Sequence, residues 1–127
     1  MRGALLLVLG VVCCSPAFAD TPDEQYTFAN GLYNEKLWSL AAENLRKFVE
    51  ANPDHAQAKT AAYQLGAALY RAEGEKGEID YAGAAAAYEK ALLKYPDPKL
   101  AATARYELGD IYSVSYTHLT LPTIYSV

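Results

Sequence analysis

The sequence predicts an all-α protein in which antiparallel helix pairs stack side by side as an α-solenoid. Three observations predict this class. Hydrophobic residues recur at the three- and four-residue spacing that places them on one face of a helix. The middle of the chain repeats itself at an offset of 43 residues, from Pro53 to Pro96, and an internal period of this size is typical of solenoids. No segment of residues 20–113 alternates with the period of two that indicates a β-strand.

Residues 1–19, which precede this array, are expected to be a secretory signal peptide. A positive start at Arg2 and an uncharged apolar run come before Ala17 and Ala19, the small residues of a cleavage site ahead of Asp20. The apolar run is shorter than the roughly 20 residues that span a bilayer, which disfavours a membrane anchor. We therefore expect an exported protein, periplasmic or extracellular and soluble after signal cleavage, with no transmembrane segment.

Both cysteines of the chain, Cys13 and Cys14, lie inside this signal. A lipoprotein signal would place a small residue before the cysteine, and Val12 fits that pattern poorly, but whether either cysteine is lipidated stays open. Cleavage after Ala19 would remove both, and the mature chain would then have no disulfide, thiol nucleophile or thiolate metal ligand.

Helix-start signals locate the elements of the array. Thr21 offers an N-cap, Pro22 suits the first helical position, and Glu24 completes a capping box. Asp54 and Gln57 form a second such box. Together with the apolar spacing, these signals predict helices near 22–34, 36–51, 55–72, 80–95 and 98–113.

Proline residues mark the helix ends. Pro53 and Pro96 cannot continue the helices before them, and Asp97 followed by Pro98 starts the last one. Small residues at repeating positions then let helix backbones approach closely, namely Ala29, Gly66 and Gly109 on first helices and Ala41 and Ala84 on second helices. The large side chains expected to fill the remaining space are Phe28, Leu45, Leu65 and Tyr88.

These positions resemble the tetratricopeptide repeat (TPR), most of all its bacterial envelope members of the Tol–Pal-associated and outer-membrane assembly lipoprotein type. The resemblance implies a right-handed α-solenoid of about two and a half TPR units over residues 20–113, truncated at the C-terminus. The repeat signature consists of Phe28, Ala29, Ala41, Leu45, Pro53, Leu65, Gly66, Ala84, Tyr88, Pro96, Leu108 and Gly109.

Residues 114–127 interrupt the pattern. They contain no Ala, no acidic residue and no Lys or Arg, so the second helix of a third unit is not expected there. The stretch from Ser115 to Thr123 resembles a translated sequencing-adapter fragment. We therefore expect a non-native tail or, alternatively, a genuine disordered or strand-like one, and the chain would then be the N-terminal fragment of a longer protein.

The composition excludes several kinds of chemistry. A net charge of −4 disfavours nucleic-acid binding, which needs a clustered basic surface. His55 has no partner at metal-ligand spacing, and the acidic residues of 73–80 lack the fixed spacing of a calcium loop. No glycine-rich phosphate loop or nucleophile elbow is present. We expect no enzyme, no catalytic residue, no metal and no cofactor.

A line of aromatic and polar residues on the first helices is the candidate binding surface. The resemblance implies that they face a concave groove that binds peptides, although Tyr26 and Tyr63 stand where family members that grasp a carboxylate have lysine. Packing between helices is an equally weighted alternative for Tyr26, Tyr63 and Tyr106. The candidate groove residues are Tyr26, Asn30, Tyr33, Tyr63, Tyr70, Arg71, Tyr106 and Asp110.

The resulting expectation is an exported scaffold that binds a protein or an extended peptide in the cell envelope. Two alternatives stay open. The array could be the N-terminal accessory region of a larger cell-envelope enzyme, or it could be a structural repeat that associates with itself.

Overall fold

The computed structural model describes the backbone of residues 21–125 and the side-chain surroundings of residues 21–114. The expected cleavage residues Ala17, Ala19 and Asp20 lie outside these residues. The described part is all-helical, as the sequence predicts, apart from one isolated β-bridge between Glu73 and Ile79. Its helices are α1 (Pro22–Asn34), α2 (Trp38–Ala51), α3 (Ala58–Arg71), α4 (Tyr81–Lys94) and α5 (Pro98–Tyr125).

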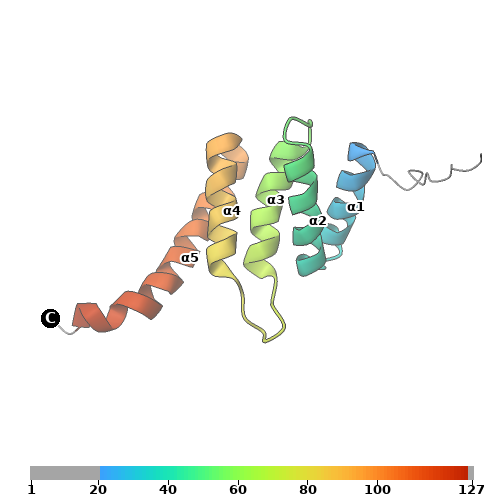
Figure 1. Cartoon of the computed structure of the whole chain (residues 1–127). Coiled ribbons are helices and arrows are strands. Elements are labelled where there is room, and N and C mark those ends of the chain that lie inside the picture. Colours follow the sequence, from blue (N-terminus) through green and yellow to red (C-terminus); the bar gives the residue numbers. More distant parts are fainter. Residues whose placement is uncertain (1–20, 126–127) are drawn as a thin grey trace, which may run out of the picture.

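Consecutive helices pack side by side in chain order. Their connections alternate between the two ends of the row, so each helix runs opposite to the one before it (Figure 1). The helices α2 and α4 both pack on α3, and α3 also contacts α1 and α5. This arrangement places α1, α3 and α5 together on one side of the row, with α2 and α4 on the other.

Two of the expected N-caps are present. The Thr21 hydroxyl accepts a hydrogen bond of 3.2 Å from the backbone N–H of Glu24 at the start of α1. The Asp97 carboxylate accepts 3.0 Å hydrogen bonds from the backbone N–H groups of Lys99 and Leu100 at the start of α5. Both side chains satisfy donors that have no partner inside the helix.

The expected capping box at Asp54 and Gln57 is wrong. Helix α3 begins only at Ala58, and its N-cap Gln57 makes no side-chain cap hydrogen bond. The preceding residues form turns, in which the backbone N–H of Ala58 donates to the His55 carbonyl at 2.9 Å and the N–H of Gln57 donates to Nδ1 of the same histidine at 3.0 Å. These turns replace the expected first turn of the helix.

Helix α2 starts at Trp38, later than the expected residue 36. The backbone of Lys36 has φ 62°, in the left-handed region that an α-helix excludes. The α1–α2 connection therefore turns at this lysine, and the N–H of Leu37 donates to the carbonyl of Leu32 at 3.0 Å.

Helix α5 extends to Tyr125, past residue 113 where the sequence pattern predicts its end. Residues 114–125 thus continue the helix instead of forming a disordered or strand-like tail. The sequence gives no local reason for this extension, because Pro122 in its interior favours an end of the helix. The extension leaves the row of helices and projects away from α4 (Figure 1).

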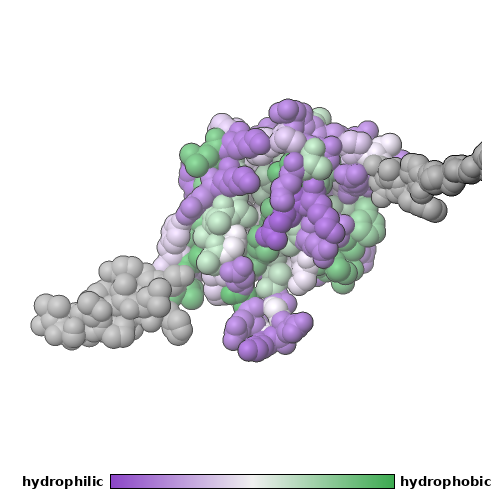
Figure 2. Space-filling view, in the orientation of Figure 1, coloured by the Kyte–Doolittle hydropathy of each residue, from purple (hydrophilic) through white to green (hydrophobic). Residues whose placement is uncertain are grey.

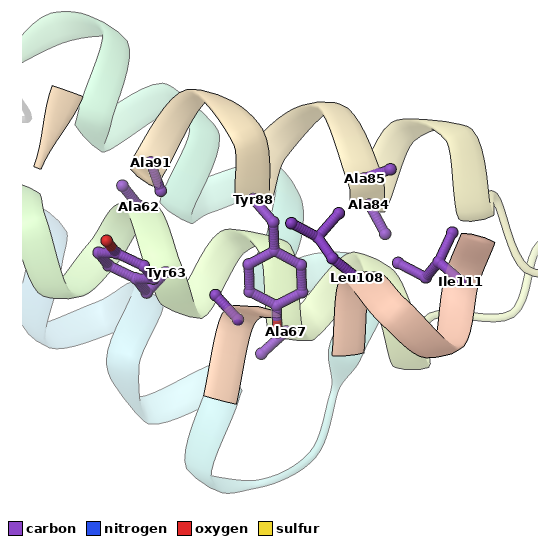
Figure 3. Packing of buried hydrophobic residues seen from close by; sticks show 10 residues of the cluster. Ala62, Tyr63, Ala67, Ala84, Ala85, Tyr88, Ala91, Leu108 and Ile111 are labelled. Atoms are coloured by element: carbon purple, nitrogen blue, oxygen red, sulfur yellow. The ribbon is translucent and has the colours of Figure 1, made fainter. Parts of the chain in front are cut away.

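The core consists largely of alanine with a few large side chains. Ala29, Ala41 and Leu45 are fully buried where α1, α2 and α3 meet. Tyr88 reaches from α4 between α3 and α5, where it is buried with Leu108 (Figure 3). The expected close approach of helices on Ala29 and Ala41 is therefore present.

Two packing expectations at the ends of the row are wrong. Phe28 was expected to fill space between helices but is 58% exposed. A Cβ built on Gly109 would meet nothing within 4 Å, so no helix approaches closely there. Both residues lie on outer helices of the described row, where no neighbouring helix covers the outward face.

The α3–α4 connection, residues 72–80, is a hydrophilic hairpin below the helices (Figures 1 and 2). The backbone N–H of Gly74 donates to the Glu78 carbonyl at 2.7 Å, and Gly77 turns the chain with φ 76°. Asp80 then caps α4 by accepting a 2.9 Å hydrogen bond from the N–H of Gly83. The acidic residues of this segment thus belong to a turn and a helix start.

Candidate functional site

The first part of the candidate site joins α1 to α3 through one amide. The Tyr26 hydroxyl donates to Oε1 of Gln64 at 3.0 Å, and Nε2 of Gln64 donates to Oδ1 of Asn30 at 2.8 Å. All three side chains are partly buried, and burial raises the pKa of the Tyr26 hydroxyl above its usual value. Gln64 therefore fixes the orientation of two residues that the sequence placed on the binding surface.

A buried carboxylate forms the second part. Glu107 on α5 is only 5% exposed and receives a 2.7 Å ion pair from the guanidinium of Arg71 on α3. The hydroxyl of Tyr88 on α4 donates to the same carboxylate. The hydrogen bond to Glu107 raises the pKa of Arg71, and burial followed by this carboxylate raises that of Tyr88. Paired in this way, the buried charge holds three helices in register.

Arg71 is also surrounded by aromatic rings. Its guanidinium carbon lies 5.8 Å from the ring centroid of Trp38 and 5.4 Å from that of Tyr70, distances at which a cation is attracted to a ring face. The Tyr70 hydroxyl donates to the carboxylate of Asp110 on α5. This hydrogen bond, followed by burial, raises the pKa of Tyr70 to about 12.

Tyr33 lies at the centre of the same face. Its ring meets that of Trp38 edge to face, with centroids 5.3 Å apart. Burial raises the pKa of the Tyr33 hydroxyl, although the positive charge of Arg71 opposes the shift. Beside this ring lies a hollow of about 150 Å³ between α3 and α5, whose lining includes Thr60, Gln64 and Thr103. A hollow of this size has room for one side chain of a bound partner.

We name the surface formed by these residues the α1–α3–α5 face. It comprises Tyr26, Asn30, Tyr33, Thr60, Gln64, Tyr70, Arg71, Thr103, Glu107 and Asp110.

Tyr63, which is expected in the groove, is buried, and it contributes to this face only as part of the lining of the hollow beside Tyr33. It is only 5% exposed, and its hydroxyl donates to the backbone carbonyl of Tyr95 at 2.7 Å (Figure 3 shows the ring). Burial raises its pKa. The packing alternative therefore describes Tyr63, which secures the end of α4 against α3.

Tyr106 takes the position of Tyr63 one repeat later but is 79% exposed. The reason is that Tyr63 packs against the helix that follows it, and in the described residues no further helix covers α5. Tyr106 is available to a partner, but no hydrogen bond or ion pair within residues 21–114 joins it to the α1–α3–α5 face.

Four residues of the face are absent from the sequence-based candidates, namely Thr60, Gln64, Thr103 and Glu107. A signal for two of them is present: Gln64 and Glu107 are separated by the repeat offset of 43, and both are polar residues among apolar neighbours. In the structure each reaches back to the preceding first helix, Gln64 to Asn30 and Glu107 to Arg71. A polar residue that recurs at the equivalent position of successive repeats thus indicates a side-chain hydrogen bond between neighbouring repeat units.

The chemical groups of this face are of the kind that contact a polypeptide. The face combines aromatic edges, hydroxyl groups, an amide and the exposed carboxylate of Asp110, which suits hydrogen bonding to a polypeptide. Among the described residues, no three His, Cys, Asp or Glu side chains lie close enough to hold a metal ion. None of the described helices has the length and hydropathy that crossing a membrane requires.

Comparisons with known proteins give no match. No family model matches the chain, and no curated protein or solved structure is significantly similar to it.

Proposed function

We propose that this protein is an exported TPR-type scaffold that binds an extended segment of another envelope protein on its α1–α3–α5 face, without a cofactor and without catalysis. The observation that supports binding most directly is that Gln64 and Glu107 tie the side chains of this face together across helices. Side chains already held in one orientation lose little conformational entropy when a partner binds.

The assignment to the repeat family is supported by the packing of equivalent positions. Ala29 and Ala41 are fully buried between neighbouring helices, and Gly66 lies against Tyr88. The Gln64 and Glu107 links recur at the repeat offset. Stacked helix pairs with recurring links are the organisation expected of a repeat array.

The chemistry of the face indicates the kind of segment it would bind. Asn30 and the threonines offer amide and hydroxyl groups to a peptide backbone, and the rings of Tyr33 and Tyr70 offer stiff contact area. The hollow of about 150 Å³ beside Tyr33 would accept one side chain. The carboxylate of Asp110, which is exposed, favours a segment with a basic or amide group at that point.

A selection experiment tests this proposal. A phage-displayed library of random peptides is selected against the full chain, and the affinity of an enriched peptide is measured by fluorescence anisotropy. We expect Tyr33→Ala and Asn30→Ala to weaken binding by at least about tenfold, as loss of a central contact would. The matched control is Lys76→Ala in the α3–α4 connection, away from the face. Unchanged affinity in both face variants, with helical content preserved by circular dichroism, would refute the proposal.

Self-association is a second candidate, favoured by the open surface of α5. Tyr106 is 79% exposed there, and Gly109 has open space beside it. Sedimentation across a concentration range distinguishes this candidate, since a strict monomer would exclude it. A Tyr106→Lys variant should lower the association constant if α5 is the contact.

A further inference from the structure

A second hollow, independent of the α1–α3–α5 face, lies between α2 and α4 on the opposite side of the row. Its volume is about 450 Å³, within the range of sites that hold a ligand. Its floor includes Leu65 of α3 and Val49 of α2. We name it the α2–α4 groove.

The groove exists because both helices rest on α3 while the first turns of α4 present only small residues to it. In its first turns, α4 lines the groove with Gly83, Ala86 and Ala87. No side chain longer than a methyl group therefore fills the space above α3 at this point. The surface between the hydrophilic side chains over α2 and those over α4 includes hydrophobic area in Figure 2.

Basic residues surround this apolar floor. Arg46 of α2 and Lys90 and Lys94 of α4 line the groove, together with the single carboxylate of Glu50. The groove is therefore locally positive in a chain whose net charge is −4. Local charge opposite in sign to the whole protein steers oppositely charged partners to one place.

None of these three cations makes an ion pair with another side chain of residues 21–114. Among the described residues Lys47 pairs with Glu43, Lys59 with Asp97 and Arg71 with Glu107. By contrast, Arg46 and Lys90 make no ion pair in the part of the chain that the structure describes, and Lys94 lies 5.6 Å from the centroid of the Tyr95 ring. Unpaired cations beside an apolar hollow are complementary to carboxylates beside an apolar side chain.

We propose that the α2–α4 groove is a second docking site, which binds an acidic peptide segment of a partner protein by taking one of its apolar side chains into the hollow. The acidic residues that flank this side chain pair with Arg46, Lys90 and Lys94. Leu93, 87% exposed next to Lys94, adds apolar surface on the same helix. With the α1–α3–α5 face and the α2–α4 groove, the protein would bind two partner segments, one on each side of the row of helices.

A peptide titration of the full chain, followed by amide NMR, tests this proposal. The probe is a short acetylated peptide with a central leucine flanked by glutamates. Binding should shift the amide signals of Val49, Ala86 and Ala87. A peptide with lysines in place of the glutamates should not bind, and one with alanine in place of leucine should bind at least about tenfold more weakly.

Two variants and one control complete the experiment. Ala87→Leu should fill the hollow and abolish the shifts, and Lys90→Glu should weaken binding by at least about tenfold. Lys76→Glu makes the same charge change in the α3–α4 connection and should leave the affinity unchanged.

Four results would overturn the proposal of a second docking site. Equal binding of the lysine peptide, absence of binding by the glutamate peptide, or shifts confined to other residues would overturn the proposal. Binding of decanoate but not of the acidic peptide would also overturn it, in favour of a fatty-acid site. Tyr33→Ala should not affect this titration, so failure here is distinguishable from failure of the α1–α3–α5 face.

Discussion

The ring of Tyr88 lies directly against the backbone of Gly66. A Cβ atom built on this glycine would come within 2.5 Å of ring atom Cδ1 and 2.7 Å of Cε1. The ring is fixed because Tyr88 is buried and donates its hydroxyl hydrogen to Glu107. This contact sets how closely α4 approaches α3.

Gly66→Ala should therefore destabilise the fold. We expect a loss of about 1–3 kcal/mol in the free energy of unfolding, since extra volume in a packed core forces side chains or backbone to move. Gly109→Ala is the matched variant, because it makes the same change at the equivalent repeat position with nothing within 4 Å. It should stabilise α5 by about 0.5–1 kcal/mol. Urea unfolding measures both, and equal effects of the two substitutions would contradict the packing described for Gly66.

Removal of the buried carboxylate should be costly. Glu107→Ala leaves the Tyr88 hydroxyl without its acceptor and Arg71 without its ion pair. We expect a loss of about 1–3 kcal/mol, the typical cost of an unsatisfied buried polar group. Glu43→Ala, which breaks the exposed pair with Lys47, should change stability little. If urea unfolding gives both variants the same stability, Glu107 is not the link between helices described here.

Stability should fall in acid through Asp97. Hydrogen bonds from the Leu100 backbone N–H and, second, from Lys59 lower the pKa of this carboxyl below its ordinary value of 3.8. Because the folded-state pKa is the lower one, the stabilisation is present above about pH 4 and is lost as the pH falls through the folded-state value. Asp97→Asn should flatten this part of the profile of unfolding free energy against pH. Lys59→Met, which leaves the cap intact, should flatten it less, and a steeper profile in either variant would contradict the assignment.

The export that the sequence predicts has a testable consequence at the N-terminus. Processing after Ala19 should give a secreted product that begins at Asp20, as N-terminal sequencing of an envelope fraction would show. Ala19→Glu should block cleavage, because the peptidase needs a small residue there. A product that keeps residues 1–12, or one confined to the cytoplasm, would count against export.

The helices could be predicted from the sequence where a local signal controls them. Thr21 and Asp97 cap helices as expected because their oxygens reach donors only a few residues away. Asp54 has the same local signal, but the turns before α3 involve His55, and no local rule foresees this. The late start of α2 depends on the left-handed backbone of Lys36, which a lysine rarely adopts.

The candidate site was less predictable because its links join residues far apart in sequence. Helical spacing placed Asn30, Tyr33 and Tyr70 on one line, but it could not show that Tyr63 turns instead toward Tyr95. Glu107 reads as an ordinary charged residue of a helix, and only the packing of α3, α4 and α5 reveals that it is buried.

Site-specific photo-crosslinking tests the central claim, partner binding on the α1–α3–α5 face, most directly. A photoreactive phenylalanine analogue is placed at Tyr33 in cells that export the full chain, with Lys76 as the control position outside both proposed sites. We predict one discrete crosslinked protein from position 33 and none from position 76. Discrete crosslinks from position 76 but none from position 33 would contradict the claim.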